Sequence, residues 1–93
     1  MEYGYNDESL KRHGVSRTDI NEVLDVENPT KRNFDLALSL DEDPRTMFVG
    51  FNLAGRLLEV GVEFIGVNYA YLFHAQTVSP KYRKLYKEMI ASE

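Results

Sequence analysis

The chain contains no cysteine among its 93 residues. It can therefore form neither disulfides nor thiolate metal sites, and a reducing compartment is the simplest fit. It also lacks a long apolar run, because the uncharged stretch from Ile65 to Pro80 includes Gly, Asn, Tyr and His and is too polar for a membrane span. The opening residues MEYGYNDES have neither the basic nor the apolar segment of a signal peptide. We expect a cytoplasmic protein with no membrane association.

Basic charge is scarce as well, since 11 Lys and Arg face 15 Asp and Glu and leave a net charge of −4. Residues 1–46 carry a charge of −5 and residues 47–93 a charge of +1. Such a balance argues against non-specific binding to nucleic acid, which depends on positive charge. It leaves open a local basic site on an acidic body.

The length predicts one domain over residues 1–93, and the 43% apolar content is typical of a folded globule. Two short helices are predicted at the N-terminus. Asn6 and Asp7 can cap a first helix that runs to residue 12, and Gly14 breaks it. Ser16 and Asp19 form a pair resembling a capping box, which predicts the start of a second helix that ends at residues 28–29.

After Pro29 the apolar period changes to two, which is typical of strands. We expect strands near residues 34–39, 46–53, 56–64 and 67–76, joined by short turns as an antiparallel meander. Ser79 and Pro80 predict the start of a last helix. Its apolar stripe should pack on the sheet and consists of Tyr82, Leu85, Tyr86 and Met89. The predicted class is α+β, with two N-terminal helices, a four-stranded antiparallel sheet and a C-terminal helix packed on it.

Three segments, in this order, resemble a known family. They are KRHGVS (residues 11–16), which is followed by a helix and Asn28-Pro29, then GRLLEV (residues 55–60), and LFHAQ (residues 72–76) before a helix that carries tyrosines. The order and spacing resemble the BrnT-like toxins over roughly residues 6–87. The chain differs from the family pattern in having Gln76 where an Arg is usual and His74 where a Ser is frequent.

The resemblance implies a RelE-like fold and the toxin of a bacterial type II toxin–antitoxin pair. Such toxins are ribonucleases that inhibit translation, on the ribosome in some cases, and they need no cofactor. The resemblance also implies a cognate antitoxin with a ribbon-helix-helix part, which neutralises the toxin. Operator DNA would be bound only through that antitoxin.

RNA cleavage without a metal needs proton transfer to and from oxygen atoms, and stabilisation of the extra negative charge on phosphorus. His74 is the candidate for proton transfer, because an imidazole changes its charge near neutral pH. Arg83, Lys81 and Arg56 are the candidates for holding phosphate. Each of them also has a structural explanation. For His74 it is a histidine hydrogen-bonded between sheet and helix, for Arg83 and Lys81 a solvated helical face, and for Arg56 a surface charge beside a turn.

Four further residues are candidates for substrate binding, namely Tyr82, Tyr86, Lys84 and His13. Tyrosine can stack on a base or donate its hydroxyl. The structural readings are that both tyrosines lie at the edge of the core and that His13 fixes the junction between the first two helices. The carboxylates of residues 41–43 have no clear further ligands, so no metal site is expected.

Two other functions stay open beside the ribonuclease. The acidic body and Gln76 favour a non-catalytic protein-binding module of the same fold. The acidic first half also fits, more loosely, an inhibitor that mimics nucleic acid.

Overall fold

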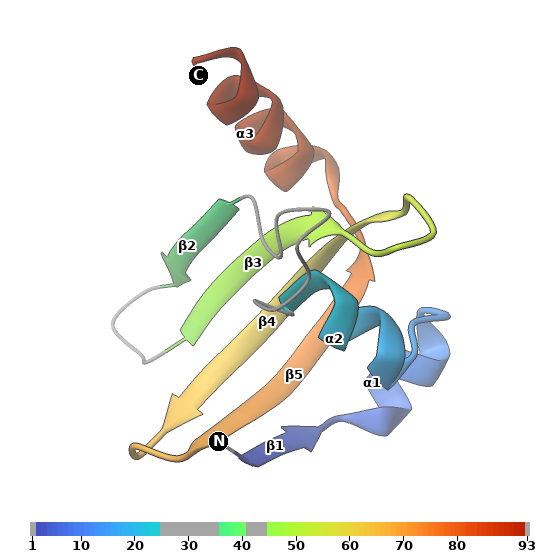
Figure 1. The fold of residues 1–93 in the computed structure, drawn as a ribbon, viewed down its shortest axis with the longest axis vertical. Helices are drawn as coiled ribbons and strands as arrows, with labels where there is room; N and C mark the ends of the chain where they lie inside the picture. Colours follow the sequence, from blue (N-terminus) through green and yellow to red (C-terminus); the bar gives the residue numbers. More distant parts are fainter. Residues whose placement is uncertain (1, 25–35, 41–44, 93) are drawn as a thin grey trace.

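The computed structural model describes residues 2–24 and 45–92, together with the backbone of residues 36–40. Figure 1 shows the elements in chain order: β1 (Glu2–Tyr5), α1 (Asp7–Arg12), α2 (Arg17–Leu24), β2 (Leu36–Leu40), β3 (Arg45–Phe51), β4 (Leu57–Ile65), β5 (Tyr69–Thr77) and α3 (Pro80–Ala91). The strands form one sheet in the order β1-β5-β4-β3-β2. The predicted α+β class is confirmed.

The N-terminal strand β1 was not predicted, and it makes the sheet mixed rather than wholly antiparallel. It pairs in parallel with β5, from Glu2 beside Tyr69 to Tyr5 beside Leu72. The other neighbouring pairs, β2 with β3, β3 with β4 and β4 with β5, are antiparallel. β1 forms because the longer β5 offers a free backbone edge to which it bonds, and that edge cannot be read from the sequence of β1 itself.

The helix signals near the N-terminus are confirmed. The Asn6 side chain accepts a hydrogen bond from the Ser9 amide at 3.3 Å and so caps α1. Gly14 has a φ of 65°, which an L-residue with a side chain rarely adopts, and it turns the chain into α2. Ser16 and Asp19 exchange hydrogen bonds at 2.9 and 3.0 Å, as in a capping box. The predicted end of this helix, the residues before Leu36 and the turn at 41–44 lie outside the described residues.

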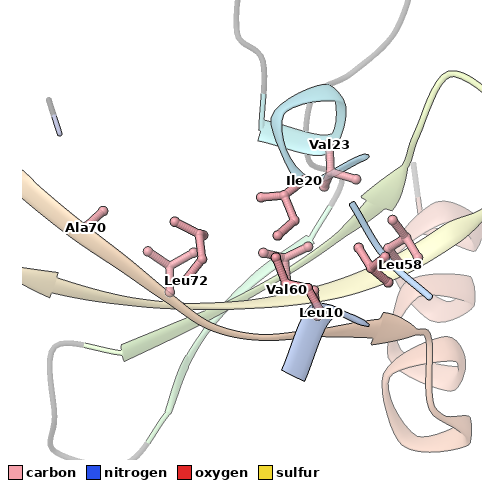
Figure 2. Packing of buried hydrophobic residues seen from close by; sticks show 10 residues of the cluster. Leu10, Ile20, Val23, Leu58, Val60, Ala70 and Leu72 are labelled. Atoms are coloured by element: carbon pink, nitrogen blue, oxygen red, sulfur yellow. The ribbon is translucent and has the colours of Figure 1, made fainter. Parts of the chain in front are cut away.

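The main core lies between the sheet and the two N-terminal helices (Figure 2). Apolar side chains of α1, of α2 and of the junction between them meet side chains of β4 and β5 there, and all of them are buried. They are Leu10, Val15, Ile20, Val23, Leu58, Val60, Val62, Ala70, Leu72 and Ala75. The two N-terminal helices therefore cover one face of the central strands.

A second, smaller core lies under α3. Tyr86 packs with Met47, Val49 and Val78, and Tyr82 and Met89 contact the same cluster. Three of the four residues of the predicted apolar stripe thus face β3, and α3 begins after Ser79 as expected. Among the described residues, no helix is long and apolar enough to cross a membrane.

Candidate functional site

A β-bulge in β5 decides which way His74 points. Val62 pairs with Leu72 and the preceding Gly61 pairs with His74, so Phe73 is an extra residue in the ladder. Leu72 therefore points into the main core while His74 points to the opposite face of the sheet. Simple alternation along a regular strand would place Leu72 and His74 on one face, but the bulge shifts the alternation by one residue.

The bulge brings His74 to Glu59 of β4. Glu59 is only 4% exposed, and one of its carboxylate oxygens lies 2.9 Å from His74 Nε2. Its other oxygen accepts a hydrogen bond of 2.6 Å from the amide of Ser79, the residue before α3. Burial raises the pKa of Glu59, but the hydrogen bonds from His74 and Ser79 outweigh it, so the pKa lies below its ordinary value. Glu59 is therefore ionised at neutral pH and fixes one nitrogen of His74.

His13 completes a cluster with this pair. Its ring centroid lies 6.0 Å from that of His74, with the rings edge to face at 70°. The His13 backbone closes α1, because its amide bonds back to the carbonyls of Ser9 and Leu10. Hence His13 has the structural role considered from the sequence and also reaches the candidate catalytic histidine. We refer to Glu59, His74 and His13 as the histidine cluster.

Arg56 lies beside this cluster but its guanidinium is held by the protein. It donates to the backbone carbonyls of Gly14 at 2.8 Å and His13 at 3.2 Å. It also donates to the Thr77 hydroxyl at 2.9 and 2.6 Å. Arg56 thus joins the junction between α1 and α2 to the end of β5. These contacts use both terminal nitrogens and Nε, which is the fork that a phosphate would need.

The cations of α3 lie on the helix surface away from its packed stripe. Arg83, Lys84 and Lys87 line an open depression of about 350 Å³ together with Pro80 and Glu88. In the part of the chain that the structure describes, these three side chains make no hydrogen bond or ion pair. No described contact joins them to His74, so the structure brings α3 to the histidine cluster through Ser79 alone.

The remaining candidates are packed at the base of α3. Tyr86 is 6% exposed and its ring meets Phe51 edge to face, with centroids 5.9 Å apart. Tyr82 is half-buried, and the ammonium of Lys81 lies 5.3 Å from the centroid of its ring. The core-edge reading of both tyrosines agrees with this packing. Lys81 lies in the first turn of α3, near the Ser79 amide that binds Glu59.

Sequence reasoning missed Glu59. Its position between Leu58 and Val60 marks it as a polar residue of an alternating strand, and the register that pairs β4 with β5 cannot be read from that alternation. The one available signal was its place in the GRLLEV segment. Within residues 2–24 and 45–92, no three His, Asp or Glu side chains are grouped as a metal site requires.

Comparisons with protein-family models and with curated proteins found no match to this chain.

Proposed function

We propose that the protein is a metal-free ribonuclease of the BrnT-like kind, the toxin of a type II toxin–antitoxin pair. The observation that carries the proposal is the pair of Glu59 and His74. A buried, ionised carboxylate holds an imidazole whose side chain is 25% exposed and so can reach a substrate. Histidine is the side chain that general acid–base catalysis uses most often, and a neighbouring carboxylate can orient it.

The meeting of the three resembling segments also supports the proposal. KRHGVS supplies His13 and the two carbonyls that Arg56 binds, GRLLEV supplies Arg56 and Glu59, and LFHAQ supplies His74. They lie far apart in the sequence, and in the fold they make one cluster. The order of helices, antiparallel strands and C-terminal helix is compatible with a RelE-like arrangement, to which β1 adds a further strand.

The mechanism follows from which nitrogen Glu59 occupies. An ionised carboxylate only accepts hydrogen bonds, so Nε2 of neutral His74 carries the proton and Nδ1 has a free lone pair. Nδ1 takes the proton of the ribose 2′-hydroxyl as that oxygen attacks phosphorus. The bond from phosphorus to the 5′-oxygen breaks and a 2′,3′-cyclic phosphate forms. His13, in its protonated form, gives a proton to the leaving oxygen.

Phosphate charge is balanced by the first turn of α3 in this proposal. Lys81 and Arg83 are the cations nearest in the chain to Ser79, whose amide binds Glu59. Arg56 is assigned a positioning role, because its donors already hold His13, Gly14 and Thr77. Tyr82, Tyr86 and Lys84 remain proposed contacts to RNA at the edge of this site, and no cofactor is needed.

The test is induction of the chain in a bacterial host with mapping of the 5′ ends of total RNA. We expect growth arrest and new RNA ends with the wild type, and neither with His74→Ala. Lys11→Ala is the matched control, because Lys11 is an exposed residue of α1 close in sequence to His13. Normal growth with abundant folded wild-type protein would contradict the proposal.

The proposal includes a protein partner. A cognate antitoxin should neutralise the toxin, and operator DNA should be bound only by the complex. Co-expression of a short neighbouring reading frame should restore growth. If the arrest persists with every neighbouring frame while the wild type still cuts RNA, the pairing with an antitoxin is wrong and the ribonuclease stands alone.

A further inference from the structure

A row of aromatic side chains leads along β5 to His74. Tyr69 pairs with Ile65, Tyr71 pairs with Glu63, and Phe73 is the bulged residue beside His74. Because paired residues point to the same side, Tyr69 and Tyr71 lie on the face that carries Glu59 and His74, opposite α1 and α2. Phe73 lies over Gly61 on this face as well. We refer to Tyr69, Tyr71 and Phe73 as the aromatic row.

Two glycines make room for the row. A side-chain carbon at Gly61 would lie 2.6 Å from the ring of Phe73, and one at Gly4 of β1 would collide with the hydroxyl of Tyr69. Both glycines have ordinary backbone angles, since neither is among the glycines of positive φ. They provide space above the strand rather than backbone freedom, so the ring of Phe73 reaches over β4 and the hydroxyl of Tyr69 reaches over β1.

The row is continuous with the histidine cluster. The rings of Phe73 and His74 have centroids 6.5 Å apart and are tilted by 34°. The Arg45 guanidinium lies over the ring of Phe73 at 5.1 Å and pairs with Glu63 at 3.0 Å. This cation–π contact occupies a face of the Phe73 ring, which leaves Tyr69 and Tyr71 as the rings on which bases stack.

The three rings are half-buried, and among the described residues no helix packs on them. We propose that the aromatic row binds single-stranded RNA by stacking on its bases and presents the adjoining ribose to His74. This inference rests on the ribonuclease function proposed above and names the form of its substrate. Aromatic rings stack on any base, at about 1–3 kcal/mol per base, and they reach only bases that are not already in a duplex.

Charge on this face favours bases over phosphates as the contact. Glu59 and Glu63 lie on it, as does Glu2, which pairs with Tyr69, and Arg45 pairs with Glu63. A phosphate backbone laid along the row would be repelled, while uncharged bases would not. In this proposal the sugar-phosphate backbone of the RNA lies away from these carboxylates and extends toward the cations of α3.

The test measures binding separately from cleavage. All proteins carry His74→Ala, and the probe is a fluorescein-labelled adenine decamer with 2′-O-methyl riboses, which cannot be cut. A second probe has the same backbone with abasic positions. Tyr71→Ala and Tyr71→Phe are compared with Tyr3→Ala, because Tyr3 is an exposed tyrosine of β1 that pairs with Ala70 and so lies on the other face. Circular dichroism checks that each variant is folded.

We expect the base-bearing probe to bind about 5- to 100-fold more tightly than the abasic one. Tyr71→Ala should remove most of this preference, whereas Tyr71→Phe and Tyr3→Ala should keep it. Equal binding of both probes, or a preference that Tyr71→Ala leaves unchanged, would overturn the inference even if the wild type cuts RNA. If Tyr71→Ala removes the preference and the wild-type protein does not cut RNA, the aromatic row is supported and the ribonuclease proposal is refuted.

Discussion

Replacing Glu59 by Gln is the sharpest perturbation of the proposed site, because it changes a charge and almost no volume. The carboxylate accepts from His74 at 2.9 Å and from the Ser79 amide at 2.6 Å. A glutamine can still accept from Ser79 with its oxygen, but its NH2 group then faces His74. That group donates, so Nε2 must become the acceptor and the proton of His74 moves to Nδ1. The nitrogen that the mechanism uses as a base is then blocked.

The expected size of the effect differs for activity and stability. Loss of a positioned base lowers a rate by about 10²- to 10⁴-fold, so cleavage should fall by that factor. Two charged hydrogen bonds become neutral ones, and each change costs about 0.5–1 kcal/mol, or about 1–2 kcal/mol together. For a domain of this size that is a fall in melting temperature of about 5–15 °C. Glu59→Ala should cost more, about 2–4 kcal/mol, because it leaves the Ser79 amide and the His74 ring without their acceptor.

The assay pairs cleavage of a purified single-stranded RNA with thermal and urea unfolding of the same preparations. Glu63→Gln is the matched control, since Glu63 lies on the same face of β4 and has its own partner, Arg45. It should leave cleavage within about 3-fold of the wild type, well inside the smallest loss expected of a catalytic base. A folded Glu59→Gln protein that cuts RNA at the wild-type rate would refute the assignment of Glu59 as the group that orients His74.

Four further predictions concern stability. The pKa of Glu59 lies below its ordinary value of 4.5, so its contribution to the free energy of unfolding is fully present above pH 4.5 and is lost as the pH falls through the folded-state pKa. In urea unfolding, the difference in stability between the wild type and Glu59→Gln should therefore close in acid. A difference that stays constant with pH would contradict this prediction. Arg56→Lys should lower the free energy of unfolding in urea by about 1–3 kcal/mol, since one ammonium cannot replace a guanidinium that donates to two carbonyls and a hydroxyl. The control Arg83→Lys should cost nothing measurable. Equal losses of stability in the two variants would refute the joining role of Arg56. Asp19→Ala should lower the free energy of unfolding by about 1 kcal/mol through loss of the capping box, and Asp19→Glu should keep most of the stability that the box provides. An unchanged melting temperature in the alanine variant would count against the cap. Gly61→Ala should cost about 1–3 kcal/mol by collision with the Phe73 ring, and Phe73→Leu in the same chain should recover part of it; no recovery would place the strain elsewhere.

Local signals in the sequence were sufficient for the helices and the approximate strands. Asn6, Gly14, Ser16 and Ser79 each act within a few residues of themselves, and the structure has a helix start or a helix break at each of them. The strands predicted near 46–53, 56–64 and 67–76 are found at Arg45–Phe51, Leu57–Ile65 and Tyr69–Thr77. Alternation and turn residues are short-range properties, so a single sequence carries them.

The features that the sequence could not predict depend on pairing between distant segments. β1 exists because β5 has a free edge, and the bulge at Phe73 depends on how β4 and β5 fit together. For the candidate site, residue type alone made His74 a candidate, and its role stays a prediction. Glu59 could not be linked to it, because the link needs both the strand register and the bulge. Arg56 was a candidate for holding phosphate, but the backbone carbonyls that occupy it come into reach only when the junction between α1 and α2 is in place.

The negative charge of the chain is compatible with a site for RNA because the charges that matter are local. At physiological salt, exposed charges interact over about 8 Å, so carboxylates on the far side of the fold have little effect at α3. Two of them are also engaged, since the Asp7 carboxylate accepts from Arg17 and the Asp19 carboxylate accepts from the Ser16 amide and the Asn52 side chain. What an acidic body does prevent is binding along a long nucleic acid, which requires many phosphate contacts. A protein of this charge that acts on RNA therefore needs contacts that do not depend on phosphate, and bases stacked on the aromatic row would supply them next to His74.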